Sequence, residues 1–531
     1  MDETPHDPTG DDGHGRFAPG VGDPTPMPPL TVTAALRLRA RVLDPVDDGT
    51  DLRPTIYVGD TLLVPGLPGR SARNPLAALD AVAEKRGLRM RVARDGARDD
   101  AVAQTGLAEQ VDQFATTLVQ FVPEPGAPAP DAFAVLREAR AADQEDALGL
   151  GDVGLCHIVS AAGYLQGVGY LQGVGYLQGV GYLQGVGYLQ GVGYLQGVGG
   201  ETRSPVRWAA PPPKRSAKGG EWGTGPVVAI VDTGLGKHEW YDPSAGVVAD
   251  LRVGGSPVGL RFAPQDDPEA TGVTVDRVNG RLDPLAGHGT FIAGIVRQYC
   301  PEATLVPVPV MYGDGAADEA DLVAALEGLL IHNLLVAHDP SQGRRIEVVC
   351  LSMGYYHESP TAVADTQALG RVLRALADDG VAVVAAAGNG ASTVEFHPAA
   401  LAAMTPWSGV PLMSVGATVL DGSRVASYSN TGPWVRAYRC GSNVVSTMPV
   451  TFNGSLQASQ ASTPVGLPAR ATPDGDDYGT GFGVWTGTSF AAPVLCGELA
   501  AALCATRDGA DGAPADGDMK AALDTVLGGQ P

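Results

Sequence analysis

The sequence predicts an α/β protein in which a small α+β domain precedes a larger domain built on a doubly wound parallel sheet. Two observations predict this order. Between about residues 30 and 162 the strand-like and helical segments follow the order βαββαβ, and from about residue 222 apolar strands and helices alternate one by one. A third observation, a six-residue repeat over 163–198, separates the two regions.

The bulk composition is that of a folded, acidic protein. At 531 residues the chain is too long for one ordinary core, so two domains are expected. Apolar residues make up 44% of the chain and charged residues 18%, which is a globular balance. The formal net charge of −23 argues against nucleic acid as a partner, because a phosphate backbone requires a basic surface.

The cysteines and the N-terminus carry little functional signal. The six cysteines lack the spacing of a zinc site and the density of a disulfide scaffold, so we interpret them as small buried side chains and expect no metal or cofactor from them. The N-terminus has neither the basic nor the apolar region of a signal peptide, and nowhere do about 18 apolar residues run without interruption. The expectation is a cytoplasmic protein without a membrane partner, with a non-standard export route left open.

The first third of the chain divides into an arm and a small domain. Residues 1–29 are acidic and rich in Pro and Gly, which predicts a disordered arm. Residues 30–162 contain predicted strands at TIYVGDTLLVPG, LRMRVARDG, ATTLVQFVPEPG and VGLCHIVSAAG, and predicted helices at NPLAALDAVAEKRG and DAFAVLREARAAD. This order indicates a two-layer sandwich of the ferredoxin-like type.

The next segment is expected to connect the domains. Residues 163–198 are six identical copies of GYLQGV, and with Gly199 and Gly200 we interpret them as a linker, with a short β-solenoid as the alternative. Residues 201–221 are rich in Pro and contain five basic residues, Arg203, Arg207, Lys214, Arg215 and Lys218, which favours an exposed linker open to proteolysis.

Residues 222–507 show the pattern of a parallel sheet with helical crossovers. Buried strands are predicted at VVAIVDTG, TLVPVPVM, IEVVCLSMG and VAVVAAAGN, and helices lie between them. The last helix begins near GTSFAAPVLCGELAAALCATR, and residues 508–531 are predicted as a tail with one short helix at MKAALDTVL. In such sheets the active site is expected at the carboxyl ends of the strands.

Three polar residues stand at element boundaries of this region. Asp232 ends an apolar strand, His288 begins a helix, and Ser489 lies among small residues at the start of the last helix. Each alone has a structural explanation: a turn cap for the Asp, a satisfied structural His, and a helix N-cap for the Ser. Together they supply a nucleophile, a base and an orienting carboxylate, which predicts nucleophilic catalysis.

Four segments around these residues resemble the signature blocks of the subtilase family of serine peptidases. The blocks occur in the family's order, and the resemblance covers about residues 222–507. They are 226–236 (VVAIVDTGLGK), 287–294 (GHGTFIAG), 385–390 (AAAGNG) and 487–493 (GTSFAAP). The resemblance implies a subtilisin-like fold and a serine endopeptidase acting on proteins or peptides.

The family's functional residues map onto matching positions. Asp232 would orient His288, His288 would act as general base and then acid, and Ser489 would attack the scissile carbonyl. Asn389 would donate its amide to the oxyanion. Two further sets would bind substrate: Ser352, Met353 and Gly354, whose free strand edge would pair with an extended peptide, and Ala386, Ala387 and Gly388, which would line the P1 pocket. The family implies no catalytic cofactor, although structural calcium occurs in many relatives.

The resemblance also implies a role for the N-terminal domain. Many subtilases have a ferredoxin-like propeptide, so residues 30–162 are expected to inhibit the peptidase in cis until the linker is cut near 201–221. One alternative stays open, a catalytically latent module that binds extended peptides in its groove. Two other enzyme classes are disfavoured. An aspartic protease would need a second matching carboxylate, and only Asn430-Thr431-Gly432 is found. A lipase-type serine hydrolase would have a G-x-S-x-G elbow, and the segment at Ser489 lacks its last Gly.

Overall fold

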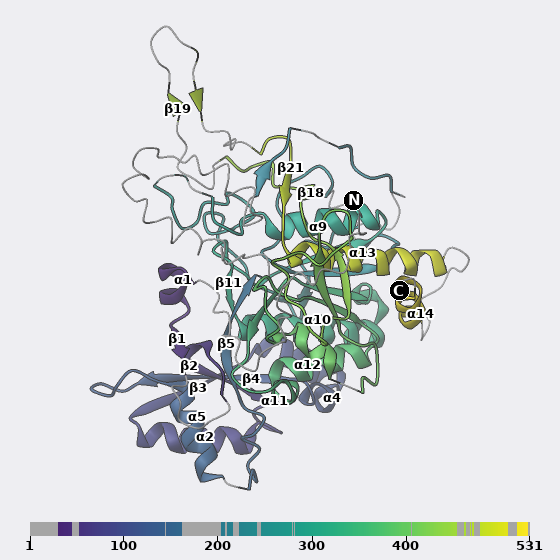
Figure 1. The fold of residues 1–531 in the computed structure, drawn as a ribbon. Coiled ribbons are helices and arrows are strands. Elements are labelled where there is room, and N and C mark those ends of the chain that lie inside the picture. Colours follow the sequence, from purple (N-terminus) through teal and green to yellow (C-terminus); the bar gives the residue numbers. More distant parts are fainter. Residues whose placement is uncertain are drawn as a thin grey trace, which may run out of the picture.

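The computed structural model contains two domains, which Figure 1 shows in purple to blue and in teal to yellow. The structure describes residues 30–44, 52–143, 145–161, 203–207, 210–215, 222–241, 246–278, 280, 282–404, 406–453, 461–462, 468, 470–471, 478–507 and 518–528. The predicted arm (1–29), the GYLQGV array (163–200) and most of the predicted tail lie outside these described residues.

The N-terminal domain has the predicted βαββαβ order. Its strands pair antiparallel in the order β5-β2-β4-β3, which is the ferredoxin-like arrangement. The elements are β2 (Thr55–Pro65), α2 (Arg73–Lys85), β3 (Leu88–Ala93), β4 (Thr116–Pro123), α5 (Ala132–Ala142) and β5 (Gly154–Ala161). Helices α2 and α5 cover the face of this sheet that lies away from the larger domain (Figure 1).

Four further elements of this domain were not predicted. They are α1 (Val32–Arg37), β1 (Ala40–Leu43), α3 (Gly96–Thr105) and α4 (Ala108–Asp112). Helix α3 has a polar N-cap, because the Asp95 side chain accepts the backbone N–H groups of Ala97 and Arg98. Its few buried side chains, Arg98 and Val102, face the larger domain, so tertiary contact rather than apolar periodicity sets its position.

Strand β2 is buried along its whole length, on both faces. Ile56, Val58 and Leu63 belong to an apolar cluster that continues into the larger domain. The alternating residues Tyr57 and Leu62 belong to a separate cluster that lies wholly within the N-terminal domain. Because successive side chains of a strand point to opposite faces, the sheet is covered by α2 and α5 on one face and by the larger domain on the other.

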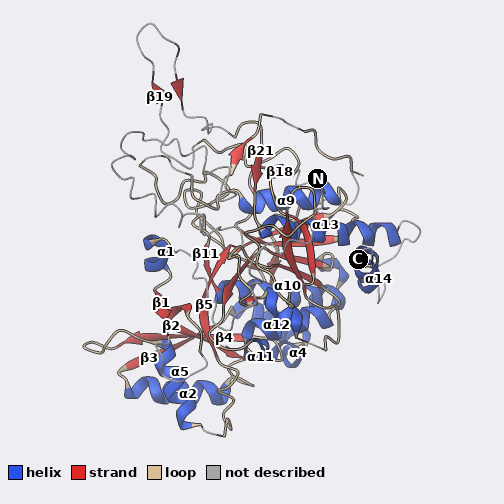
Figure 2. Cartoon of the chain, viewed as in Figure 1, coloured by secondary structure: helices blue, strands red, loops and turns tan. Residues whose placement is uncertain are grey.

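The larger domain is a doubly wound α/β structure, as predicted. Its six-stranded sheet is parallel throughout, in the order β10-β7-β12-β14-β16-β17. The strands are β7 (Val227–Asp232), β10 (Thr304–Pro309), β12 (Val348–Leu351), β14 (Ala382–Ala386), β16 (Met413–Thr418) and β17 (Ala437–Cys440). Figure 2 shows this sheet in red with blue helices above and below it.

The two helical layers have distinct members. On one side α9 (His288–Tyr299) and α13 (Thr488–Arg507) pack together, and α13 also packs on β12, β14 and β16. On the other side lie α10 (Glu319–His338) and α12 (Ala368–Asp378). By length and composition α10 and α13 could cross a membrane, but most of each is buried inside the protein, which is typical of core helices.

Shorter elements surround this core. They are β6 (Ser204–Pro205), β8 (Arg252–Val253), β9 (Ser256–Pro257), α11 (Thr361–Thr366), the 3-10 helices at Pro340–Gln342 and Ala399–Ala403, β18 (Val444–Thr447), β19 (Ala461–Ser462), β20 (Arg470–Ala471), β21 (Phe482–Trp485) and α14 (Asp518–Leu527). Strands β18, β21 and β6 form a small sheet.

Part of the predicted exposed linker is instead packed on the larger domain. Strand β6 pairs with β21, and Arg203 next to it is buried. The Arg203 guanidinium donates to the carbonyl oxygens of Ala286 and Asp283 and lies 5.0 Å from the ring centre of Trp485. The expectation that Arg203 is an exposed linker residue is therefore wrong, because its charge is satisfied by buried carbonyl groups.

The two domains share one sheet. Strand β5 pairs antiparallel with β11 (Ala316–Asp318) on one side and with β13 (Met353–Tyr356) on the other, and β13 pairs in turn with β15 (Phe396–His397). The edge of β13 was expected to be free for a peptide. In this structure it is occupied by the last strand of the N-terminal domain.

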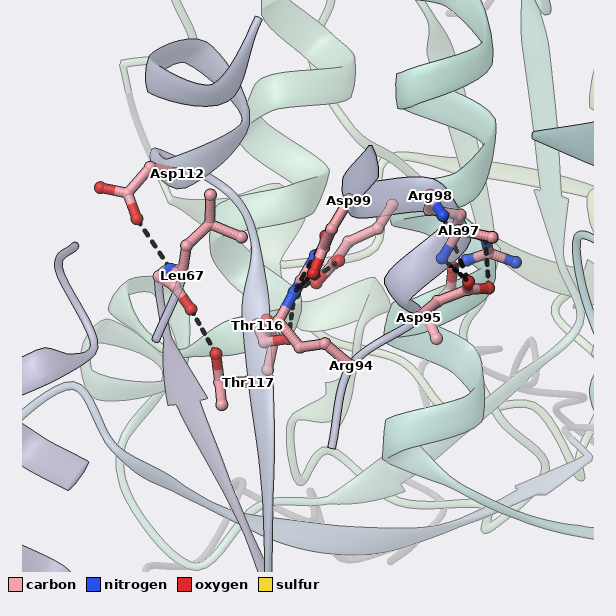
Figure 3. Close-up of polar contacts among 12 residues, drawn as sticks. Leu67, Arg94, Asp95, Ala97, Arg98, Asp99, Asp112, Thr116 and Thr117 are labelled. Atoms are coloured by element: carbon pink, nitrogen blue, oxygen red, sulfur yellow. Dashed lines mark hydrogen bonds and ion pairs between the residues drawn. The ribbon is translucent and has the colours of Figure 1, made fainter. Parts of the chain in front are cut away.

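Buried arginines reinforce this contact on the β3–α3 side. Arg98 donates to the carbonyl oxygen of Ala324 on α10, at 2.7 Å, and to that of Pro257. Arg94 pairs with Asp99 at 2.8 Å and reaches Glu327 on α10 at 3.5 Å. Figure 3 shows these two arginines with Asp95, Asp99 and Thr116 beside the helices of the larger domain. Each guanidinium is thus compensated by acceptors from both domains, which favours one docked arrangement.

Candidate active site

The site begins with a buried carboxylate and imidazole pair. Asp232 is the last residue of β7 and His288 the first of α9, and both are fully buried. His288 Nδ1 lies 2.8 Å from Asp232 Oδ1. Because a carboxylate can only accept, Nδ1 carries a proton, and in this tautomer of the neutral ring the lone pair is on Nε2. Among the described residues nothing hydrogen-bonds to Nε2.

Close backbone approach makes this pair possible. Asp232 Oδ1 also accepts the backbone N–H of Thr233 at 2.8 Å and lies 3.1 Å from its hydroxyl oxygen. A Cβ on Gly289 would lie 2.2 Å from the carbonyl oxygen of Gly234, so the loop after β7 and the start of α9 can meet only where a side chain is absent.

A second buried carboxylate, Glu269, stands behind the pair. It accepts hydrogen bonds from the hydroxyls of Thr233 and Thr290, the latter at 2.6 Å, and from the backbone N–H of Gly289 at 3.1 Å. Burial raises the pKa of Glu269 to about 7, against the opposing effect of the two threonine hydroxyls. Glu269 was not predicted. It holds both segments that present Asp232 and His288.

Ser489 lies in the first turn of α13 and is fully buried. Its hydroxyl donates to the carbonyl oxygen of Ser352 at 3.3 Å, and the Ser352 hydroxyl donates to the carbonyl oxygen of Ser489 at 2.9 Å. The structure therefore brings Ser489 to the end of β12 but records no hydrogen bond between it and His288. Trp485 and Phe490 pack on His288, each with its ring centre 5.4 Å away, and screen the imidazole from water.

Asn389 is held in one orientation beside Ser489. Its Oδ1 accepts the backbone N–H of Thr488 at 2.9 Å and the Thr488 hydroxyl at 2.8 Å. Its Nδ2 is buried and has no hydrogen-bond partner among the described residues. A buried amide donor without a partner is costly, so it is available for a negatively charged oxygen bound next to Ser489.

The loop that holds Asn389 is organised by Asn430, a residue whose role was not predicted. Its Oδ1 accepts the backbone N–H groups of Gly390 and Ser392, at 2.9 and 3.1 Å, and its Nδ2 donates to the carbonyl oxygen of Ala387 at 2.9 Å. The Asn430-Thr431-Gly432 segment was weighed only as a possible second acidic motif. The role of Asn430 could not be predicted from the sequence, because the groups that it binds are backbone groups far away in the chain.

The two predicted substrate-binding sets lie at neighbouring strand ends. Ser352 and Met353 are buried at the junction of β12 and β13, and a Cβ on Gly354 would lie 2.2 Å from the carbonyl oxygen of His397. Ala386 and Ala387 at the end of β14 are also fully buried, and Gly388 after them has a left-handed φ of 95°. Of the six, Ser352 contacts Ser489 and the Gly388 N–H donates to the Thr488 hydroxyl, and all six are buried.

Comparison of the sequence with known proteins points to one family. A family model described as the subtilase family matches residues 223–523, more than half of the chain. The chain is similar to the subtilase-type proteinase RRT12 of Saccharomyces cerevisiae, at 29% identity over 185 residues, which covers 34% of this chain and 34% of the relative. It is also similar to the serine protease AprX of Bacillus subtilis, at 26% identity over 300 residues, which covers 52% of this chain and 57% of the relative.

A third relative corrects one expectation. The extracellular protease of Xanthomonas campestris is 25% identical over 296 residues, which covers 52% of this chain and 44% of the relative. The chain thus spans between a third and somewhat over half of the length of these curated relatives. The expectation of a cytoplasmic location is wrong by this comparison, because the relative is named for its place outside the cell, whereas the expectation rested only on missing export signals.

The raised pKa of Glu269 predicts a pH-dependent stability difference. A carboxyl group whose pKa is raised by folding binds its proton more tightly in the folded state, so its contribution to stability falls as the pH rises from its ordinary pKa to the raised one. In a Ser489→Ala background, Glu269→Gln should therefore gain stability over its parent between about pH 4.5 and 7, by on the order of 3 kcal/mol.

Chemical denaturation across this pH range measures the difference. The matched control is Glu239→Gln, which removes an exposed carboxylate and should leave the profile unchanged. If the free energy of unfolding of Glu269→Gln changed with pH in parallel with that of its parent, the assignment of a raised pKa to Glu269 would be contradicted.

Proposed function

The chain belongs to the subtilase family of serine peptidases, and from this membership we propose that it is an endopeptidase whose nucleophile is Ser489. The observation that carries the proposal is the convergence of Asp232, His288, Asn389 and Ser489 at the carboxyl ends of adjacent parallel strands and the first turns of α9 and α13. The substrates we propose are proteins or peptides bound in extended form along β13.

Acylation would proceed through His288 as the base. Nε2 of His288 takes the Ser489 proton while Oγ attacks the peptide carbonyl carbon, and the Asp232 carboxylate stabilises the resulting imidazolium through Nδ1. The same proton then passes from Nε2 to the leaving amine. Water, deprotonated by Nε2, releases the acyl group and restores the hydroxyl, so no charge is left on the enzyme.

The tetrahedral oxygen would be stabilised by Asn389. The amide Nδ2 cannot rotate away, because its Oδ1 is held by two donors from Thr488. Backbone N–H groups in the first turn of α13 have no acceptors within the helix, and they reinforce the same region of positive potential.

We further propose that the N-terminal domain keeps the peptidase latent. Strand β5 pairs with β13 in the manner expected of a substrate, with Ser160 opposite Gly354 and Ala161 opposite Met353. The Ala161 N–H also donates to the carbonyl oxygen of Gly315 on the other side, at 3.0 Å. A strand held on both edges excludes a second peptide from the same groove.

The register points to where the chain would cut itself. Continued past Ala161, β5 leads towards Ser352, whose carbonyl holds the Ser489 hydroxyl. Cleavage is therefore expected in the first residues after Ala161. This differs from the expected cut near 201–221, part of which is packed on the larger domain at β6.

A latent peptide-binding module is the second candidate, and the buried state of Ser489 favours it. The two functions separate in one experiment. A fluorophosphonate should label Ser489 after removal of residues 30–161 by limited proteolysis if the chain is a peptidase, whereas a binding module stays unlabelled.

Loss of the nucleophile or the base should abolish activity and self-cleavage together. We expect Ser489→Ala and His288→Ala each to lower peptide hydrolysis by about a million-fold with the fold intact, since the groups act as a unit. Mass spectrometry should show Ser489→Ala uncut and the wild type cut shortly after Ala161. Ser423→Ala, at an exposed loop, is the control, and equal processing of Ser489→Ala and this control would rule out Ser489 as the nucleophile.

Loss of the amide donor should affect the chemical step. We expect Asn389→Ala to lower kcat by about two to three orders of magnitude with little change in KM, as is typical when one oxyanion donor is removed from a serine peptidase. Asn389→Asp keeps the acceptor for Thr488 but lacks the donor, so it should be at least as slow. Steady-state kinetics on the processed enzyme separates the two constants, and a change in KM alone would make Asn389 a binding residue instead.

Weakening the interdomain contact should raise the activity of the intact chain. Arg98→Ala removes two buried hydrogen bonds to the larger domain, and a loss of about 2 kcal/mol would increase the open fraction about 30-fold. Arg86→Ala removes an exposed ion pair with Glu138 on the outer helices and should change nothing. Initial rates on a short peptide, measured before any cleavage, test this. Equal rates for the two variants would refute inhibition by the docked domain.

A further inference from the structure

Two strands, and the residue that follows a third, place histidines close together at the sheet that joins the domains. His157 lies on β5, His397 lies on β15, and His357 follows β13, two residues after Tyr355. Tyr355 is directly opposite His397 in the β13–β15 pairing, and its ring stacks on His157 at 4.3 Å. Side chains two residues apart on a strand share a face, so the three imidazoles gather around one point. All three are buried.

The first histidine has one ring nitrogen already oriented by a carboxylate. Glu319, at the start of α10, lies 2.6 Å from His157 Nδ1 through Oε2 and accepts the Tyr355 hydroxyl at 2.8 Å through Oε1. This is the arrangement that fixes a metal-binding imidazole, in which the nitrogen away from the ion is hydrogen-bonded to a carboxylate. The other nitrogen, Nε2, lies 2.6 Å from Glu358 Oε2, so a proton is shared between these two atoms and a metal ion that binds Nε2 must displace it.

The second histidine is oriented in the same way. His357 Nε2 lies 3.0 Å from the side-chain oxygen of Gln367, which requires the proton on Nε2. Its Nδ1 therefore has a lone pair. That lone pair accepts the backbone N–H of Ser359 at 2.9 Å, a bond that a metal ion at Nδ1 would replace, and Nδ1 lies 3.4 Å from Glu358 Oε2. Two imidazole nitrogens from different domains thus converge on one buried carboxylate.

The third histidine supplies an independent sign of a ligand. His397 is 1% exposed, its ring centre lies 5.5 Å from that of His357, and among the described residues neither of its ring nitrogens has a hydrogen-bond partner. A buried imidazole with two unsatisfied nitrogens is costly unless something binds it.

The geometry points to a zinc site that fastens the N-terminal domain to the larger one, with His157 Nε2, His357 Nδ1 and a Glu358 oxygen as ligands and His397 as the nearby fourth. One donor atom from each of His157, His357 and Glu358 lies within 4.8 Å of the others. A tetrahedral zinc ion with bonds of about 2.1 Å needs its ligand atoms roughly 3.4 Å apart. Binding would therefore adjust the spacing of these three atoms.

Chemistry decides which cation fits. Imidazole nitrogens with one carboxylate suit zinc, whereas calcium prefers six to eight oxygen ligands at longer distances. Charge also favours a dication, because Glu319 and Glu358 are both buried within this group. The sequence did not predict the site, since the histidines are far apart in the chain and meet only through strand pairing.

Direct binding tests the site on the full chain. Ser489→Ala protein, stripped with a chelator, should bind one zinc ion per chain by calorimetry and metal analysis, and added calcium should not compete. His157→Gln keeps a side chain able to bond both glutamates, and it should weaken zinc binding by more than about a hundredfold. Glu319→Gln should weaken it by about 10- to 100-fold, as expected for a group that orients a ligand. The control His338→Gln changes an exposed residue on α10.

Hydrogen exchange shows whether the ion joins the domains. Zinc should slow exchange of the β5 and β13 amides together, and His157→Gln should remove this effect while β3 and β4 stay protected, which also verifies folding. No zinc binding, or equal binding by His157→Gln and the His338→Gln control, would overturn the proposal. The role of the ion in latency rests on the proposed inhibition, but binding and exchange are read without activity, so the two proposals can fail separately.

Discussion

Parallel strands end at the same edge of their sheet, and the whole candidate active site depends on that constraint. Strand β7 delivers Asp232, β12 delivers Ser352, and β14 leads to the loop of Asn389, all at one edge. Helix α13 packs across the same strands and brings Ser489 to this edge. The crossovers cover both faces of the sheet, so the edge is the place where buried polar groups can meet.

Buried charge is the second organising feature, and the chain compensates it with groups from distant segments. Glu269 binds two threonine hydroxyls and one backbone amide around the Asp232 and His288 pair. Arg98 and Arg203 each use carbonyl oxygens of the larger domain. Such groups are costly to bury, and their hydrogen bonds are strongly directional. They therefore restrict the relative orientation of docked segments more than apolar contacts do.

The sequence predicts the features that depend on local patterns and misses those that depend on contacts between distant segments. The apolar alternation and the small-residue blocks around Asp232, His288 and Ser489 are local signals, so both domain folds and the proposed catalytic residues could be predicted. Helix α3 could not be predicted, because its inward side chains are one arginine and one valine. The very short strands β11 and β15 could not be predicted either, because they are defined by their pairing with β5 and β13. Glu269 lies in a polar loop, where nothing local marks a buried carboxylate.

The double burial of β2 has a consequence for the fate of the N-terminal domain. One of its apolar clusters is internal, but Ile56, Val58 and Leu63 contribute to a core completed by the larger domain. A separated N-terminal domain would retain its helices and present an apolar sheet face to water. Large exposed apolar faces promote aggregation and attract proteolysis. Departure of this domain would therefore be a one-way event, because the detached partner is lost from solution faster than it can return.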